Sequence, residues 1–342
     1  MKFHLQKDSK DSIYRQLVVQ VEHAIHEGSL LSGEQIPSMN ELASQLHISR
    51  ETVKKAYGIL VDKGIIVPKQ GRGFFVADAN TSDRRLQVLV IFDKVSVYKQ
   101  ILFNALAERM GESAELTIVN HNQSLDLLEY YLDNNLDYFD YYVVTPHFPL
   151  DETSQARAVK QLSRIPYRKL IMLDRLQPNF TGNFGAVYQD FENDIYTGLV
   201  QGMESPSQTK MLRVITLPAS LYGKSIHKGI ERFSREFSIP AEFLTDSPKD
   251  IHKGDTFLVL NSQLDAGLVS LAREIRREGL NIGTDVKIIS YNEADMYELV
   301  LGGLTTVSTD FREMGRLAAD MILSRHLEKI HCPFRMIRRC TF

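Results

Sequence analysis

Basic side chains are concentrated in one short stretch of this 342-residue chain. Residues 50–72 contain six basic and two acidic side chains, a local charge of +4, whereas the whole chain has a formal net charge of -3. The six basic residues are Arg50, Lys54, Lys55, Lys63, Lys69 and Arg72. A concentrated positive patch on an otherwise acidic protein attracts a polyanion, so the stretch indicates a local polyanion site.

Three short helices are expected to position these basic residues. Apolar residues from Ile13 to Ile25 recur at helical spacing,. Ser38-Met39-Asn40-Glu41 has the pattern of a capping box, and Ser49 follows the turn "HIS" as the cap of the next helix,. In that helix a buried stripe at i, i+3, i+4 and i+7 is expected at Val53, Ala56, Tyr57 and Leu60,. Glu51, Lys54, Lys55 and Gly58 then face outward, with Arg50 in the exposed first turn, and the pair of helices predicts a helix-turn-helix.

A hairpin is expected directly after the helices. The segment "IIVPKQGRGFFV" has two apolar runs separated by a turn that contains Pro68, Gly71 and Gly73,. Its tip, residues 69–73, is slim, basic and rich in glycine. Such a tip can enter a groove of DNA or lie along phosphates.

These features together closely resemble the winged helix-turn-helix of GntR-family transcription regulators. The matching residues, within residues 1–76, are Ile36-Pro37-Ser38, Glu41-Leu42-Ala43, Ile48-Ser49-Arg50, Thr52-Val53, Ala56-Tyr57, Leu60, Gly64, Gly71-Arg72-Gly73 and Phe75-Val76. The resemblance implies that Arg50 and Lys54 meet DNA from the recognition helix and that Arg72 lies in the wing. Asn40 departs from the arginine usual in the family, and asparagine can still donate to a phosphate or read adenine.

The expected DNA-binding set combines both helices and the wing. It consists of Ser38, Asn40, Ser49, Arg50, Glu51, Thr52, Lys54, Lys55, Lys69, Gly71, Arg72 and Gly73. Winged-helix regulators commonly dimerise to read two half-sites. We therefore expect a homodimer bound to double-stranded operator DNA, with strong salt dependence.

The pattern changes after a polar segment, residues 77–85, which is expected to be a linker,. Apolar runs then alternate with helical stretches. The expected strands are 86–92, 114–120, 140–146, 168–174, 211–218, 255–261 and 285–291, and the expected helices are 98–110, 124–134, 152–164, 223–236, 264–278 and 295–301. Two such alternating sets predict an α/β domain with two doubly wound parallel-sheet subdomains.

Residues 86–342 resemble the effector domain of LacI-family repressors, which shares its fold with periplasmic sugar-binding proteins. The residues that carry the resemblance are Asp174-Arg175, Asp190, Gly279-Leu280, Asp285-Val286, Ser290-Tyr291, residues 304–307, Met314-Gly315, Ala318-Ala319 and residues 339–341. We expect the first subdomain to comprise about residues 86–184 and 310–330. The second is expected to comprise about residues 185–305 and 331–342.

Ligands of open α/β sheets bind at the carboxyl ends of the strands, so a cleft between two subdomains collects polar residues from both. The expected effector-binding residues are Phe92, Asp93, Ser96, Thr145, His147, Asp174, Arg175, Tyr222, His227, Asn261 and Asn292. Such a set offers polar partners for sugar hydroxyls and aromatic faces for their C–H patches. Asp174 and Arg175 are equally consistent with an ion pair inside one subdomain.

Three positions that are charged in many LacI-type proteins are neutral here, namely Ile226, Ser262 and Asn292. We therefore expect an effector other than the best-known sugars of that family. A neutral monosaccharide is the first hypothesis and a sugar phosphate is the second.

Other classes of function find little support in the sequence. Gly223-Lys224-Ser225 lacks the glycine that a phosphate loop requires five residues earlier, where Pro218 stands,. No signal peptide or membrane-length apolar run is evident, so we expect a cytoplasmic protein with no membrane partner, and no cofactor or metal site. The two halves together resemble arabinose-responsive repressors. The hypothesis is a sequence-specific repressor of carbohydrate-utilisation genes, not an enzyme, and the alternative is a sugar-binding receptor without a DNA role.

Overall fold

The computed structural model describes residues 3, 5, 12–69, 71–77, 85–136, 138–203, 209–216, 220–260 and 266–342. The chain divides into two compact units, Met1–Arg85 and Leu86–Phe342. Most of the expected linker, residues 77–85, lies outside the described residues. Within the described ranges, none of the helices has the length and apolar character needed to cross a membrane.

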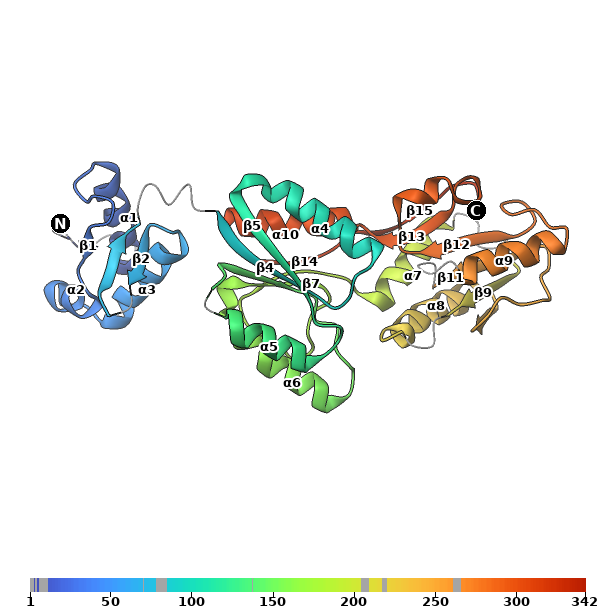
Figure 1. Cartoon of the computed structure of the whole chain (residues 1–342), viewed down its shortest axis with the longest axis horizontal. Helices are drawn as coiled ribbons and strands as arrows, with labels where there is room; N and C mark the ends of the chain where they lie inside the picture. The colour runs from blue at the N-terminus through green and yellow to red at the C-terminus, as the bar shows by residue number, and fades with distance from the viewer. Residues whose placement is uncertain are drawn as a thin grey trace. The chain divides into compact units, whose positions relative to one another are not determined.

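In the described part of the first unit, three helices accompany a small sheet (Figure 1). The helices are α1 (Ile13–His26), α2 (Met39–Leu46) and α3 (Arg50–Asp62), which confirms the expected helix-turn-helix. Leu17 and Val21 of α1 pack with Leu42 of α2 and Leu60 of α3 in one apolar core. The apolar face of each helix is buried in this core, so the opposite face of α3 is exposed to solvent.

The sheet of the first unit has the order β1-β3-β2. Strands β2 (Ile66–Lys69) and β3 (Gly73–Val76) form the expected antiparallel hairpin, with Ile66 opposite Val76 and Lys69 opposite Gly73. Strand β1 (Gln35–Ile36) pairs with β3 on its other side. A strand of two residues has no detectable periodicity, and the sequence did not predict it.

The second unit begins with a six-stranded sheet of order β14-β8-β7-β6-β4-β5. Its strands are β4 (Leu86–Phe92), β5 (Ala114–Asn120), β6 (Tyr141–Val144), β7 (Leu170–Asp174), β8 (Gly185–Tyr188) and β14 (Lys329–His331), all parallel. Its helices are α4 (Val97–Met110), α5 (Leu125–Asn135), α6 (Glu152–Leu162) and α10 (Phe311–Ser324).

Alternation along β4 explains why helices cover both faces of this sheet. Val88 and Val90 point into a core shared with α4 and α10, whereas Leu89 and Ile91 point into a core shared with α5 and α6. Helices α4 and α10 lie side by side on one face (Figure 1). Gly315 permits that approach, because a Cβ atom there would stand 2.2 Å from the carbonyl oxygen of Leu102.

A second six-stranded sheet has the order β10-β9-β11-β12-β13-β15. Its strands are β9 (Met211–Ile215), β10 (Ala241–Leu244), β11 (Asp255–Val259), β12 (Lys287–Tyr291), β13 (Thr305–Thr309) and β15 (Phe334–Ile337). Helices α7 (Phe191–Gly202) and α8 (Gly223–Phe237) pack on one face, and α9 (Ala266–Arg277) packs on the other. Among the described strand pairs of this second sheet, only β15 runs antiparallel to its neighbour, and the other strands are parallel. The expected doubly wound α/β fold is therefore confirmed.

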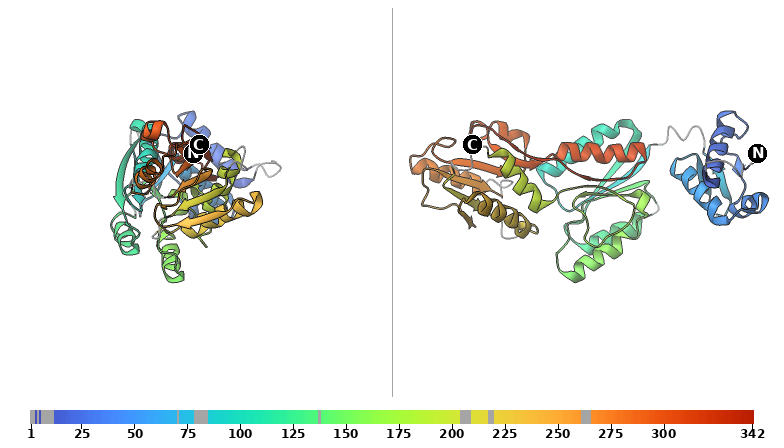
Figure 2. Two further views of the ribbon diagram at one scale, coloured as in Figure 1. Left: turned by 90° about the vertical axis from the view of Figure 1, so that its right-hand side faces the viewer. Right: turned by 180° about the vertical axis from the view of Figure 1, so that it is seen from behind.

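Along its described residues, the second unit crosses between its two sheets three times (Figure 2). The crossings follow β8, β13 and β14, near residues 189, 310 and 332. The change of subdomain, expected at about residue 185, lies a few residues later in the structure, because β8 pairs with β7 in the first sheet. Similarly, β14 extends that sheet to His331, beyond the expected limit of residue 330. Strands β8 and β14 are short, and their apolar patterns do not reveal which sheet they join.

The expected helix at 295–301 was wrong. The structure has two separate 3-10 turns there, Asp295–Glu298 and Val300–Gly302. Leu301 has φ 55° and Gly302 has φ 76°, so the backbone leaves the right-handed helical region before a second turn can form,.

Candidate functional site

Helix α3 presents its basic residues because local caps and a buried stripe fix its orientation. The hydroxyl of Ser49 accepts a hydrogen bond from the amide of Thr52 at 3.1 Å. Val53, Ala56 and Leu60 are completely buried. The Tyr57 hydroxyl donates to the carbonyl oxygen of Pro37 at 2.7 Å, which ties α3 to the loop before α2. Arg50, Glu51, Lys54 and Lys55 consequently lie on the exposed face, as expected.

The cap of α2 uses Ser38, a member of the expected DNA-binding set, together with Glu41. The Glu41 amide donates to the Ser38 hydroxyl at 3.2 Å, and the Ser38 amide donates to the Glu41 carboxylate at 2.8 Å. The backbone and side-chain hydrogen bonds from Ser38 lower the pKa of the Glu41 carboxyl group. Asn40 remains exposed in this first turn. Ser38 and Ser49 therefore serve first as helix caps, and any contact with DNA would be additional.

The cationic side chains of the first unit differ in whether they contact an anionic or aromatic group of the protein itself. Lys54 lies 3.4 Å from the Glu51 carboxylate, and Lys55 lies 4.0 Å from the centre of the Tyr14 ring. Within the described part of the chain, the guanidinium groups of Arg50 and Arg72 have neither an ion-pair nor a hydrogen-bond partner. Arginine donors of this kind suit phosphate oxygens and guanine edges.

The wing tip is a tight turn between β2 and β3. The Arg72 amide donates to the carbonyl oxygen of Lys69 at 2.9 Å. Gly71 has φ 70° and Gly73 has φ 100°, values that favour glycine,. The Lys69 ammonium group lies 4.6 Å from the centre of the Phe75 ring. The tip is thus compact and presents two cations, which suits a groove or a phosphate backbone.

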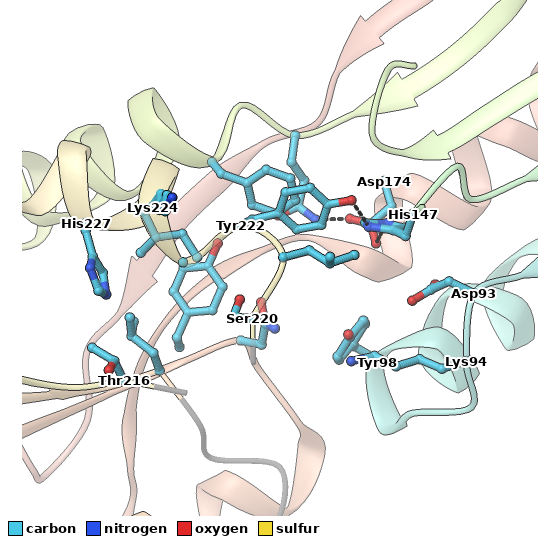
Figure 3. A pocket seen from close by; sticks show the side chains of 18 of the residues that line it. Asp93, Lys94, Tyr98, His147, Asp174, Thr216, Ser220, Tyr222, Lys224 and His227 are labelled. Atoms are coloured by element: carbon cyan, nitrogen blue, oxygen red, sulfur yellow. Dashed lines mark hydrogen bonds and ion pairs between the residues drawn. The ribbon is translucent and has the colours of Figure 1, made fainter. Parts of the chain in front are cut away.

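A cavity of about 320 Å³ lies in the second unit, where the carboxyl ends of strands from both sheets meet (Figure 3). This volume is at the lower end of the range for small-molecule sites. The expected residues that line it are Asp93, His147, Asp174, Tyr222, His227 and Asn292. Four of these six, Asp93, His147, Asp174 and Asn292, come from the strand-end rule, which therefore located the pocket and part of its wall.

Four expected effector-binding residues do not line the cavity, and their side chains have other tasks. Phe92 is buried in the core under α4, because its side of β4 faces that helix. Ser96 caps α4 by accepting from the Lys99 amide at 3.3 Å. Thr145 is fully buried and donates to the Asp93 carboxylate at 3.1 Å. The Arg175 guanidinium lies 5.1 Å from the centre of the Tyr222 ring. Asn261 lies outside the described residues.

A buried charge network forms one wall of the pocket. Lys99, which is 2% exposed, lies 2.5 Å from the Asp174 carboxylate and 3.3 Å from that of Asp93. His147 Nε2 lies 2.9 Å from the same oxygen of Asp174, and the Gln189 amide donates to the other oxygen. Asp174 thus pairs with Lys99 and His147 rather than with its neighbour Arg175, which settles the alternative left open by the sequence.

Electrostatics fix the charge states in this network. Burial by itself would raise the pKa of Asp174, but Lys99 and His147 outweigh burial and hold that pKa well below its ordinary value,. Burial would likewise lower the pKa of Lys99, but Asp174 and Asp93 reverse this effect and raise it. The ion pair between Lys99 and Asp174 therefore stays charged across the physiological range. Asp174 also has φ 72°, an unusual backbone conformation that positions its side chain at the end of β7,.

Tyr222 connects the two walls of the pocket. It precedes α8 in the second subdomain, and its hydroxyl shares a hydrogen bond of 2.7 Å with Nδ1 of His147 in the first. The Tyr222 ring stacks on Phe191 with a centroid distance of 4.4 Å and an interplanar angle of 3°. The hydrogen-bonded series of side chains Asp174, His147 and Tyr222 resembles an acid–base relay. However, burial raises the pKa of Tyr222, so its hydroxyl remains protonated and suits hydrogen bonding rather than nucleophilic attack,.

Several polar atoms remain available to a ligand. Nε2 of His227 and Oδ1 of Asn292 are buried atoms with no hydrogen-bond partner among the described residues. Burial lowers the pKa of His227, so this side chain is neutral near pH 7. Lys94 and Lys224 also line the cavity, are exposed, and have no ion-pair partner in the described ranges. Unsatisfied polar atoms in a small cavity favour a ligand rich in hydroxyl groups.

Sequence reasoning missed fourteen of the twenty described residues that line the pocket. The additional lining residues are Lys94, Tyr98, Gln123, Gln189, Phe191, Thr216, Ser220, Leu221, Gly223, Lys224, Ile226, Leu260, Tyr291 and Phe311. Gln123 and Gln189 follow β5 and β8, so the strand-end rule could have found them. Phe191 and Phe311 begin helices directly after chain crossings, and their location depends on the hinge, which the sequence did not resolve.

The two units match different families of known proteins. Residues 13–76 match the family of bacterial regulatory proteins called the gntR family, and residues 229–339 match the periplasmic binding protein-like domain. These matches agree with the helix-turn-helix of the first unit and the paired sheets of the second.

Two relatives match most of this chain over most of their own length. The chain is 24% identical to an arabinose metabolism transcriptional repressor of Halalkalibacterium halodurans, over 89% of this chain and 87% of the relative. A protein of the same name from Geobacillus stearothermophilus is 21% identical, over 96% and 97%. The structure of a dimeric Lac repressor with a C-terminal deletion is similar in fold, with a TM-score of 0.59 and 18% identity over 75% of this chain and 98% of that chain.

Proposed function

We propose that this chain, which joins a gntR-family DNA-binding domain to a periplasmic-binding-protein-like domain, is a transcriptional repressor of carbohydrate-utilisation genes whose DNA binding is controlled by a small sugar. The observation that carries the proposal is the contrast in chemistry between the two units. Arg50 and Arg72 are exposed cations free to meet DNA, and the second unit contains a pocket lined by polar and aromatic residues from both sheets. The names of the whole-length relatives support the same assignment.

A neutral monosaccharide is the effector that we favour. Asp93, His227 and Asn292 offer hydrogen-bonding atoms, and Tyr98, Phe191 and Tyr222 offer aromatic faces. The first sugar to test is arabinose, since both whole-length relatives are called arabinose metabolism repressors. A sugar phosphate is the second candidate, because Lys94 and Lys224 are exposed cations at the same cavity.

The control mechanism that we propose is closure of the pocket around the sugar. Closure would rotate the two subdomains about the three crossings. This rotation would change the spacing of the two DNA-binding domains in a homodimer on operator DNA. A sugar can shift this equilibrium only by its difference in affinity for the two states, typically about 1–3 kcal/mol. The protein would act in the cytoplasm, where metabolite and promoter are both present.

Three measurements test the assignment. A thermal-shift screen of sugars and sugar phosphates should raise the melting temperature for at least one compound, because a ligand of the folded state alone stabilises it. Arg50→Ala should weaken binding to a promoter fragment by about 1–3 kcal/mol and leave the sugar-induced shift unchanged. Deletion of residues 1–76 should abolish DNA binding while sugar binding persists. Full DNA binding by Arg50→Ala, or loss of sugar binding in this variant, would contradict the proposal.

A further inference from the structure

Gln35 is an exposed residue of the short strand β1 whose side chain reaches the wing. β1 pairs with β3 so that Gln35 stands opposite Phe75 and Ile36 stands opposite Phe74. From this position the side-chain amide of Gln35 donates to the carbonyl oxygen of Arg72 at 2.7 Å. The contact joins residues 37 positions apart in the sequence, and it ends on the residue that carries the free guanidinium group of the wing.

The described residues show few other restraints on the backbone around Arg72. The paired part of the hairpin ends at Lys69 and Gly73, and among these described residues a turn hydrogen bond from the Arg72 amide to Lys69 closes the tip. Gly71 has open space where a Cβ atom would stand, so packing does not restrain it. Gly73, by contrast, lies against Gln35, since an added Cβ atom would stand 3.1 Å from Nε2 of Gln35. The Gln35 amide is therefore a clamp on an otherwise exposed turn.

We propose that Gln35 is a positioning residue for DNA binding. Its amide holds the Arg72 peptide group, so the Arg72 side chain starts from a restricted backbone and loses less conformational freedom when it meets a phosphate or a groove edge. The inference rests on the proposed DNA-binding function and adds a residue that does not itself touch DNA. Loss of one exposed hydrogen bond of this kind corresponds to an affinity change of about three- to tenfold.

The experiment is a double-mutant cycle on the full chain with a promoter fragment, measured by fluorescence anisotropy at several salt concentrations. Gln35→Met removes the amide donor and keeps the length of the side chain. It should weaken binding about three- to tenfold in the otherwise unchanged chain and have little effect in an Arg72→Ala background. Arg72→Ala should reduce the slope of log affinity against log salt by about 0.9, and Gln35→Met should move the slope in the same direction.

The matched control is Gln45→Met, the same chemical change at an exposed position of α2 away from the wing turn. It should leave both affinity and salt slope unchanged. Wild-type affinity and slope in Gln35→Met, despite a clear loss in Arg72→Ala, would overturn the clamp alone. An equal loss in both backgrounds would also overturn it, because Gln35 would then act independently of Arg72. No effect of Arg72→Ala would overturn it too. No promoter preference in the unchanged chain would instead refute the proposed function.

Discussion

The two units use charged side chains in opposite ways. In the first unit the guanidinium groups of Arg50 and Arg72 are exposed and have no partner among the described residues. In the second unit Lys99 and Asp174 are almost completely buried and paired with each other. A cation that binds an external polyanion is left without an internal partner, whereas a charged group that shapes a pocket forms its ion pair within the protein. The comparison teaches that function at the first site depends on exposed charge, and at the second on a prebuilt wall.

The largest expected effect follows from breaking the buried network. Asp174→Ala leaves the Lys99 ammonium group buried without its nearest carboxylate. Removing one partner of a buried ion pair costs about 3–5 kcal/mol of the free energy of unfolding. We expect a lower denaturation midpoint for the second unit, measured by circular dichroism in urea. Arg50→Ala is the matched comparison and should stay within about 0.5 kcal/mol of the unchanged chain, because its side chain is exposed,. Equal losses in the two variants would remove the proposed distinction between the units.

His121 provides a test of the buried side of the comparison through pH. Burial lowers its pKa from 6.5 to about 4, although its hydrogen bond to the Thr145 carbonyl partly opposes the shift. The unfolded chain therefore binds a proton below pH 6.5 that the folded chain takes up only near pH 4. Folding stability is lost as the pH falls through this window, by up to about 3 kcal/mol. Urea denaturation at pH 7, 5.5 and 4 measures the loss.

The matched variant is His121→Gln, which keeps an N–H donor for the Thr145 carbonyl but does not titrate,. Its stability should fall less between pH 6.5 and pH 4 than that of the unchanged chain. The other titratable groups are the same in both proteins, so the difference reports on His121. Parallel pH profiles would show that this histidine is not buried in its neutral form.

Tyr222 allows the connection between the pocket walls to be tested. Tyr222→Phe removes the hydroxyl that bonds His147 but keeps the ring that stacks on Phe191. We expect effector affinity to fall about fivefold, the equivalent of about 1 kcal/mol, because one hydrogen bond across the closed pocket is lost. Isothermal titration with the sugar found by the thermal-shift screen measures the change. Unchanged affinity would mean that the contact does not stabilise the state that binds the effector.

The smallest expected effect is on the stability of the DNA-binding unit. Ser38→Ala removes the hydroxyl that accepts from the Glu41 amide at the start of α2. Loss of such a cap costs about 1 kcal/mol, so the first unit should melt at a lower temperature while effector binding is unaffected. A change in effector affinity in this variant would argue against separate roles for the two units.

Local signals explain why the first unit was readable from the sequence. Caps at Ser38 and Ser49, the apolar stripe of α3 and the glycines of the wing all act within a few residues, so their patterns predict structure directly. Strand ends such as Asp93, His147 and Asp174 were found in the same way, because each follows its own apolar run. The clamp by Gln35 was missed, since it depends on pairing between β1 and β3.

Long-range contacts explain what was missed in the second unit. Lys99 lies in the first turn of α4, and nothing in its local sequence shows that it turns inward to Asp93 and Asp174. The hinge depends on which sheet β8 and β14 join, and this choice is made by tertiary pairing rather than by their own patterns,. Phe191 and Phe311 reach the pocket only because the chain crosses at this hinge.

The most direct test of the account is the affinity of the full chain for a promoter fragment, measured with and without a saturating sugar from the thermal-shift screen. We expect the sugar to change this affinity by about 5- to 150-fold, and the same fragment to change the affinity for the sugar by the same factor. Equal affinity for promoter and random duplex DNA, or a promoter affinity that the bound sugar leaves unchanged, would contradict the account.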